Sequence, residues 1–253
     1  KKGKYTMSNR SIHTLLKNWD EECPLTREEA VEVLNLPEEE MDSLMECAYA
    51  LRTKYKGKKV SVQLLTNVRS GNCTQNCAYC AQSKDSQAEI EKYKRVSDEK
   101  LYGDNDLVDE KHLARHCIGL SGIGFSDEEI EDLADRIREM KKKDTQICCS
   151  IGFLTEKQAR ILKDAGLDRI NHNLNSSRSF YPEICTTHTY DQRVNNIKML
   201  QSLGFEICSG GIVGMGESKE DIVDMLMDLR EINPESVPIN FLLPIPGTKL
   251  ADR

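Results

Sequence analysis

Six short apolar segments alternate with helical segments through most of this chain, and this alternation limits the fold more than any other feature. The candidate strands are Val60–Asn67, Arg115–Leu120, Gln146–Ile151, Arg169–Leu174, Phe205–Gly211 and Val237–Leu243. Helical periodicity lies between the later strands, at Asp127–Lys142, Glu156–Asp164, Asp191–Leu203 and Lys219–Ile232. Strands that alternate with helices form a parallel sheet with right-handed crossovers, so the sequence predicts an α/β fold.

The first part of the chain has helical periodicity and no strand pattern. Thr26 is a candidate N-cap, with Glu29 as its capping-box partner, and Lys56-Gly57 is a candidate helix end. The expected helices are Ser11–Trp19, Arg27–Leu34 and Glu38–Tyr55. We therefore expect a helical extension at residues 1–58 and a barrel domain at 59–253. Leu101–Asp109, which contains Gly103-Asp104-Asn105-Asp106, is a poor helix and stays unassigned.

Composition limits the class of partner. The formal net charge is −7, which argues against nucleic acid, and no run of 18 apolar residues predicts a membrane span. The basic start of the chain lacks the apolar core of a secretory signal, so a cytoplasmic location is expected. Ten cysteines in such a reducing compartment indicate metal or redox chemistry for some of them.

Side chains alternate across a strand, so the face of each strand cysteine can be predicted. Ile147, Cys149 and Ile151 share one face, which leaves Cys148 on the other. The same alternation turns Cys117 inward and, with weaker contrast, Cys208. If the apolar faces meet the helices, three cysteines share one interior. The alternative is that each is a small buried hydrophobic residue.

Amides gather on the same predicted faces. Asn171, Asn173 and Asn175 oppose Ile170, His172 and Leu174, and Asn240 lies on the corresponding face of the last strand. These amides can bind a ligand or simply tie the strands together. By the same alternation His172 is expected to be a core or helix-facing residue.

A Cys-x3-Cys-x2-Cys pattern follows the first strand, at Cys73, Cys77 and Cys80. Thiolates are suited to iron–sulfur clusters and to zinc. Three cysteines can hold three irons of a four-iron cluster and leave the fourth iron open to a ligand. Structural zinc would need a fourth protein ligand, and no Cys or His lies between Cys80 and His112.

This loop, with the aromatic Tyr79 before its last cysteine, resembles the motif of the radical S-adenosylmethionine (SAM) superfamily. The resemblance implies a [4Fe-4S] cluster whose open iron is chelated by SAM, with the Tyr79 backbone near the adenine. The glycine-rich run Gly210–Glu217 is similar to a second superfamily element. It implies cofactor contacts from Gly210 and Ile212.

Four further segments are similar to the biotin synthase family, together with Tyr79–Ser83 of the loop. They are Asn171–Asn175, Thr186–Tyr190, Ile207–Gly214 and Glu235–Asn240. This resemblance implies a TIM-type (β/α) barrel, of which six strands are visible here. It also implies insertion of sulfur into dethiobiotin, with a flavodoxin- or ferredoxin-type electron donor and a homodimer.

The family's second cluster supplies the sulfur atom, and its matching ligands here are Cys117, Cys148 and Cys208. By the same resemblance Asn171, Asn173 and Asn240 line the substrate and SAM pocket, and Asn173 and Asn175 contact SAM. Arg115 is expected beside the second cluster, or in a structural ion pair.

Two departures from the family stand out. Asn175 occupies a position where the family usually has Asp, and the late strand that carries the family's arginine ligand is not visible before Arg253. We therefore hypothesise that the second cluster is either [2Fe-2S] or an atypical four-iron form, with Cys149 and Cys185 as surplus cysteines. The competing functions are another radical SAM reaction on a small amide-bearing substrate, and a non-enzymatic iron–sulfur sensor or carrier.

Overall fold

The computed structural model describes residues 25–253, in a chain that divides into two compact units, Lys1–Val60 and Ser61–Arg253. In the first unit the predicted capping box is confirmed, since the Glu29 N–H donates to Thr26 Oγ1 at 3.2 Å and Glu29 Oε2 accepts from the Thr26 N–H at 2.9 Å. This box begins α2 (Arg27–Leu34), and the 3₁₀ turn η1 (Glu38–Glu40) leads into α3 (Met41–Lys56). The expected helix Ser11–Trp19 lies outside the described residues.

The second unit is built on parallel strands, as predicted. They are β1 (Gln63–Arg69), β2 (Arg115–Leu120), β3 (Ile147–Ser150), β4 (Arg169–Asn171), β5 (Glu206–Cys208), β6 (Gly211–Val213) and β7 (Ile239–Phe241). β1 to β5 pair in chain order, and β6 pairs with β7. The predicted strand Phe205–Gly211 is therefore divided into β5 and β6. Single bridges, Asn175 to Gly211 and Cys208 to Ser236, join the two sheets into one open barrel-like array.

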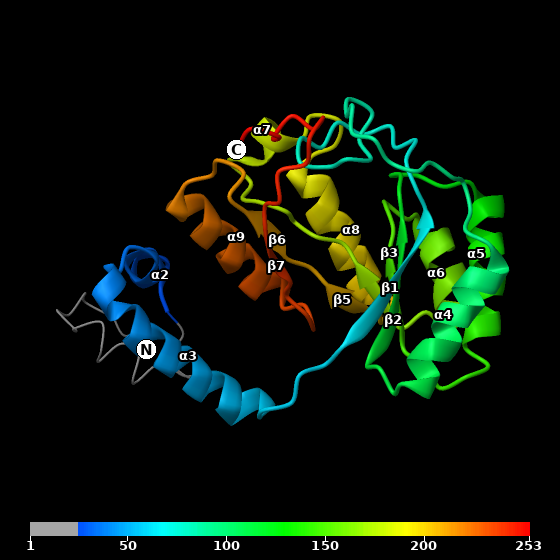
Figure 1. Cartoon of the computed structure of the whole chain (residues 1–253), viewed down its shortest axis with the longest axis horizontal. Coiled ribbons are helices and arrows are strands. Elements are labelled where there is room, and N and C mark those ends of the chain that lie inside the picture. The colour runs from blue at the N-terminus through cyan, green and yellow to red at the C-terminus, as the bar shows by residue number, and fades with distance from the viewer. Residues whose placement is uncertain (1–24) are drawn as a thin grey trace. The chain divides into compact units, whose positions relative to one another are not determined.

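Helices follow the strands on their outer side. They are α4 (Asp98–Glu110), α5 (Asp127–Met140), α6 (Glu156–Asp164), α7 (Tyr181–Ile184), α8 (Tyr190–Ser202) and α9 (Lys219–Ile232). Figure 1 shows α4, α5 and α6 along one side of the strands β1 to β3. Capping boxes begin α5, α6, α8 and α9, so local sequence fixes where each strand-to-helix loop ends.

The segment that sequence patterns left unassigned, Leu101–Asp109, is the helix α4. Its inward face is partly polar, because Asp104 and Asn105 are buried beside Leu101 and Val108. Thr66 Oγ1 donates to Asp104 Oδ2 at 2.7 Å, and Asn105 Nδ2 donates to the Met140 carbonyl at 3.1 Å. Tertiary hydrogen bonds thus stabilise a helix that hydrophobic periodicity cannot reveal.

The predicted alternation across the strands is confirmed on the side that faces the helices. Ile118, Ile147, Cys149, Ile170 and Ile207 are completely buried in the hydrophobic core. The side chains that alternate with them are polar or thiol groups and lie outside this core. The strands therefore present a chemically distinct inner face, which positions the site.

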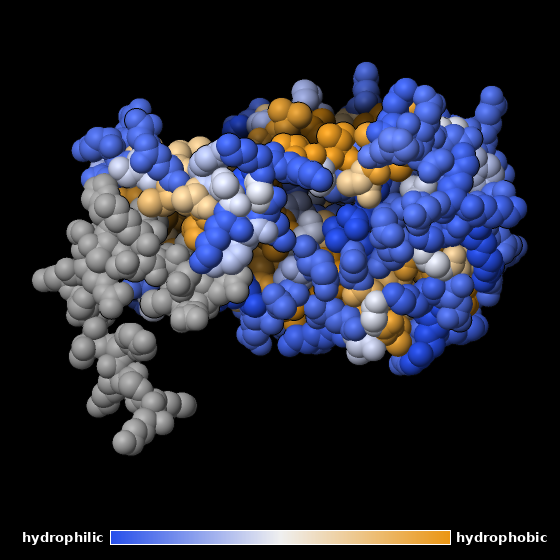
Figure 2. Space-filling model, turned by 90° about the horizontal axis from the view of Figure 1, so that it is seen from below, coloured by the Kyte–Doolittle hydropathy of each residue, from blue (hydrophilic) through white to orange (hydrophobic). Residues whose placement is uncertain are grey.

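Apolar groups are exposed on both outermost strands. Leu65 of β1 and Phe241 of β7 are 70% and 80% exposed. Figure 2 shows apolar residues reaching an otherwise hydrophilic surface. Within residues 25–253, no helix is long and apolar enough to cross a membrane.

Candidate functional site

A cavity of about 270 Å³ lies where the strands end, and most of the predicted site residues line it. The predicted residues that it contains are Cys73, Cys77, Tyr79, Cys80, Asn171, Asn173, Asn175, Ile212 and Asn240. Carboxyl ends of parallel strands are the usual location of ligand sites in α/β barrels. The cluster loop and the strand amides, which are about 100 residues apart in sequence, therefore form one site.

The cluster loop is held by the segment that follows α7. Asn76 Nδ2 donates to Thr186 Oγ1 at 2.7 Å, and Asn76 Oδ1 accepts from the Thr186 N–H at 3.0 Å. The Ala78 N–H donates to the Ile184 carbonyl at 2.9 Å. These contacts fix the position of the loop at the edge of the cavity.

The donor set fits a four-iron cluster with three protein ligands. Cys73, Cys77 and Cys80 all border the same open volume, and thiolates are the ligands of such clusters. Burial raises the pKa of Cys80, while backbone N–H groups of Gln82 and Ser83 act in the opposite direction. The Gln82 N–H can therefore hydrogen-bond a cluster thiolate, while the Ser83 N–H also donates to the Cys80 carbonyl at 3.1 Å.

A partly buried arginine, which sequence patterns do not identify, connects several groups that surround the cavity. Arg193 Nε donates to Tyr181 Oη at 2.5 Å and its NH1 donates to the Asn173 carbonyl at 3.0 Å. Its NH2 lies 2.8 Å from His188 Nε2. The sequence signal nearest to this arginine is the segment Thr186–Tyr190, which contains its partner His188.

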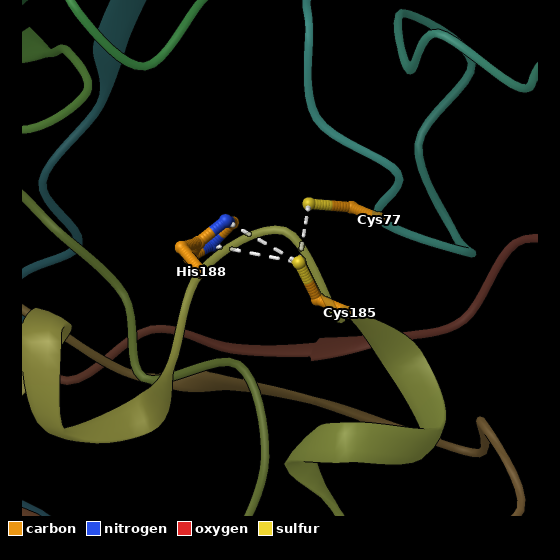
Figure 3. A group of neighbouring side chains, drawn as sticks. All are labelled: Cys77, Cys185 and His188. Atoms are coloured by element: carbon orange, nitrogen blue, oxygen red, sulfur yellow. Dashed lines mark hydrogen bonds between the residues drawn. The ribbon is translucent and has the colours of Figure 1, made fainter.

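Cys77 also contacts a cysteine that is not in the loop motif. Its Sγ lies 3.8 Å from Cys185 Sγ, and His188 Nδ1 lies 3.3 Å from the same sulfur (Figure 3). The hydrogen bond between the two thiols raises the pKa of Cys77 and lowers that of Cys185 to about 3. The sequence shows no fourth zinc ligand between Cys80 and His112, but the fold brings two potential ligands, Cys185 and His188, to Cys77.

A second set of thiols lies on the inner face of the strands, as predicted. Cys117 pairs in register with Cys148, and Asn171 pairs with Cys208. The hydrogen bond with Cys148 lowers the pKa of Cys117 against the effect of burial. Asn171 Nδ2 donates to Cys208 Sγ at 3.4 Å. These three thiols do not line the cavity. Asn171 connects the two sites, because it lines the cavity and also contacts Cys208 of the thiol set.

Charged groups accompany this second set. Arg169 NH2 and Arg115 NH2 lie 2.6 and 3.4 Å from Glu206 Oε2, so Arg115 takes part in an ion pair. Both guanidinium groups lower the pKa of Cys117, and both are largely buried. Positive charge beside a thiol favours the thiolate, which is the form that binds iron.

The surplus cysteines do not join this set. Cys149 is completely buried in the hydrophobic core on the helix side of β3, and Cys185 lies at the cluster loop. Neither surplus cysteine lies with Cys117, Cys148 and Cys208, and the type of the second cluster stays a prediction. Alternation within a strand separates Cys149 from Cys148, while loop packing places Cys185 elsewhere.

Two other predicted positions, Gly210 and His172, differ in whether they reach the cavity. Gly210 does not line the cavity, and a Cβ atom there would lie 1.8 Å from the Pro238 carbonyl oxygen, so packing alone requires glycine. His172 is buried, as expected, and its ring centroid lies 5.2 Å from that of Phe153. It also lines the cavity.

Comparison with known proteins agrees with this arrangement. The model of the radical SAM superfamily matches residues 67–229, so the chain belongs to that superfamily. Biotin synthase of Geobacillus kaustophilus is 42% identical over 228 residues, covering 90% of this chain and 68% of that protein. Biotin synthase of Bacillus subtilis is 40% identical over 227 residues, covering 89% and 68%. Within the superfamily, the chain is a member of the biotin synthase family.

Solved structures confirm the fold. Methylornithine synthase superposes with a TM-score of 0.84 at 18% identity, covering 96% of this chain and 71% of that chain. A maturase of the [FeFe]-hydrogenase gives a TM-score of 0.77 at 19% identity, covering 94% and 56%. At such low identity these similarities support the parallel α/β architecture and nothing finer.

Proposed function

We propose that the chain inserts sulfur into dethiobiotin in a SAM-dependent reaction that uses two iron–sulfur clusters. The observation that carries this proposal is the position of Asn171. Its side chain lines the cavity beside the loop cysteines and also hydrogen-bonds Cys208 of the second thiol set. A substrate bound at Asn171 would lie between the SAM site and the sulfur source.

Cys73, Cys77 and Cys80 would hold a [4Fe-4S] cluster with SAM, and Cys117, Cys148 and Cys208 would hold the second cluster. When bound, the first cluster supplies the electron that cleaves SAM and the second supplies the sulfur atom. The protein's own contribution is orientation and exclusion of water. No general base is required by this division of roles.

The amides suit the ureido ring of dethiobiotin, because amides both donate and accept hydrogen bonds. Asn173 Oδ1 already accepts from the Gly210 N–H at 3.1 Å, so its Nδ2 group is the part that can donate to a ligand carbonyl. Arg193 fixes the backbone of the same residue through its carbonyl. Asn240 and Asn171 would complete the substrate contacts, and Tyr79, Asn175 and Ile212 the SAM contacts.

The proposed partners follow the same scheme. A flavodoxin- or ferredoxin-type protein would donate the electrons, and the active form would be a homodimer. Size-exclusion chromatography with light scattering would test the dimer.

The test is anaerobic reconstitution with iron and sulfide, followed by assay of 5′-deoxyadenosine and biotin with dethiobiotin, SAM and a reductant. Cys77→Ala should abolish both products. Cys148→Ala should reduce biotin far more than 5′-deoxyadenosine. Cys149→Ala is the matched control, because that neighbour faces the helices and should retain both activities.

Two outcomes would contradict the proposal. Formation of 5′-deoxyadenosine without any thioether product would indicate another radical SAM reaction on this cavity. Labile clusters without SAM cleavage would indicate a sensor or carrier.

A further inference from the structure

Cys185 is a buried thiol that the proposed reaction does not use. The three-cysteine motif already supplies the ligands of the loop cluster, and the second thiol set lies on the strands. Yet the Sγ atoms of Cys185 and Cys77 are 3.8 Å apart, although 108 residues separate them in sequence (Figure 3).

The two cysteines are held together by their backbones as well as by their side chains. The residue after Cys77, Ala78, donates its N–H to the carbonyl of the residue before Cys185, Ile184, at 2.9 Å. Asn76 reinforces this contact through Thr186. The two Cβ positions are therefore fixed near each other without any metal.

We propose that Cys77 and Cys185 form a reversible disulfide when the chain lacks its cluster and meets a peroxide. A disulfide requires the sulfurs to approach to about 2.0 Å, which side-chain rotation supplies when the two backbones are already adjacent. The site is thus a modification site that shares one residue with the cluster. Cluster and disulfide exclude each other.

The difference in exposure between the two thiols determines which of them reacts first with the peroxide. Cys77 lines the cavity, whereas Cys185 is only 4% exposed, so the peroxide reaches Cys77 first. The Cys77 thiol gives its proton to the departing oxygen as its sulfur attacks the other peroxide oxygen, the O–O bond breaks, and a sulfenic acid and water are formed. The Cys185 sulfur then attacks the Cys77 sulfur, the S–O bond breaks, and a second water leaves. Two thiols lose two electrons and one peroxide becomes two waters.

The neighbours of Cys185 support its role as the second nucleophile. Arg193 faces His188 Nε2 at 2.8 Å, and a guanidinium can only donate, so the ring proton of a neutral His188 resides on Nδ1. That Nδ1–H lies 3.3 Å from Cys185 Sγ and 2.9 Å from Gln75 Oε1. The imidazole ring and Cys77 therefore hold the Cys185 sulfur between them, within reach of the sulfur that it attacks.

The disulfide would protect the cluster-free loop from irreversible oxidation. Thiols oxidised beyond the sulfenic acid are lost, whereas a disulfide is restored by thiol reductants. While the bond exists, the loop offers two cysteines instead of three, so the cluster cannot be rebuilt. This inference depends on Cys77 being a loop ligand and is independent of the sulfur-insertion reaction.

Peptide mapping of the full-length, cluster-free chain tests the proposal. The chain is treated with hydrogen peroxide, alkylated, and digested with trypsin without reduction. Trypsin gives residues 70–84, with Cys73, Cys77 and Cys80, and residues 179–193, with Cys185 alone. The expected species is these two peptides joined, with fragment ions that place the bond at Cys77.

Cysteine variants identify which two cysteines form the disulfide. Cys185→Ser should remove the joined species, whereas Cys149→Ser, another buried cysteine, should retain it. Dithiothreitol should abolish the bond and raise iron uptake on reconstitution several-fold over the oxidised chain. A bond confined to residues 70–84, a bond from Cys185 to Cys73 or Cys80, or full iron uptake by the cross-linked chain would each overturn the proposal.

Discussion

Asp221 connects the loop that follows β4 to the first turn of α9, and we predict that its removal destabilises the barrel unit. Its Oδ1 accepts from Ser177 Oγ at 2.6 Å and from Ser179 Oγ at 2.7 Å, and its Oδ2 accepts from the Ser218 N–H at 3.0 Å. Ser177 is buried, whereas Ser179 is exposed. The loop tied down in this way also contains Asn175, one of the residues that line the cavity.

The magnitude follows from those contacts. A buried hydrogen bond to a charged acceptor contributes about 1.5–3 kcal/mol, and a helix-capping interaction contributes about 0.5–1 kcal/mol. Because Asp221 is itself partly exposed, we take the low end and expect Asp221→Ala to reduce the free energy of unfolding by about 2 kcal/mol. Asp221→Asn, which retains an acceptor oxygen, should cost about half as much.

The effect should also depend on pH. Burial alone would raise the pKa of Asp221, but the hydrogen bonds from Ser177, Ser179 and Ser218 lower it to about 2. A carboxyl group whose pKa is lowered by folding stabilises the native state above its ordinary pKa and loses that contribution as the pH falls. The difference between the wild type and Asp221→Asn should therefore shrink from pH 7 towards pH 2, by less than about 1 kcal/mol because the group is solvent-screened.

Urea unfolding followed by circular dichroism, at pH 7 and at the lowest pH that the chain tolerates, measures both effects. Glu220→Gln is the matched control, since Glu220 is an exposed acid in the same helical turn. A loss for Asp221→Ala no larger than that of the control would refute the reasoning. So would a difference between wild type and Asp221→Asn that grows as the pH falls.

Three further substitutions should change the free energy of unfolding by amounts that differ in sign or size. Thermal or urea unfolding measures each change. Gly210→Ala places a Cβ 1.8 Å from the Pro238 carbonyl oxygen and should cost about 3 kcal/mol or more. Gly103→Ala, in the middle of α4 with nothing within 4 Å of the added Cβ, should stabilise the chain by about 0.5–1 kcal/mol. Leu162→Ala, at a completely buried position of α6, should cost about 2–5 kcal/mol. Equal effects for the two glycine substitutions would contradict the packing argument.

Much of the fold follows from local rules that the sequence expresses directly. Capping residues such as Ser126 and Thr155 mark the starts of α5 and α6, and the strand pattern predicts β2 without error in its bounds. The helix α4 was missed because Asp104 and Asn105 point inward, where hydrophobic periodicity expects apolar side chains. Its stability depends on partners such as Thr66, which are distant in sequence.

The two sets of thiols also differ in whether local sequence is enough to predict their position. Alternation predicts the inner face for Cys117, Cys148 and Cys208, because a strand residue's direction is fixed once its neighbours' burial is known. Parallel pairing in register then brings the cysteines of adjacent strands together. Local sequence and one topological assumption are therefore sufficient for this set.

No such rule locates Cys185. It follows a four-residue helix and precedes the segment Thr186–Tyr190, so neither strand nor helix periodicity fixes its direction. Its approach to Cys77 depends on the Ala78 N–H and the Ile184 carbonyl, groups that every ordinary residue provides. A contact made by backbone groups leaves little trace in side-chain identity, so the thiol pair at the cluster loop could be found only after the fold had brought the two loops together.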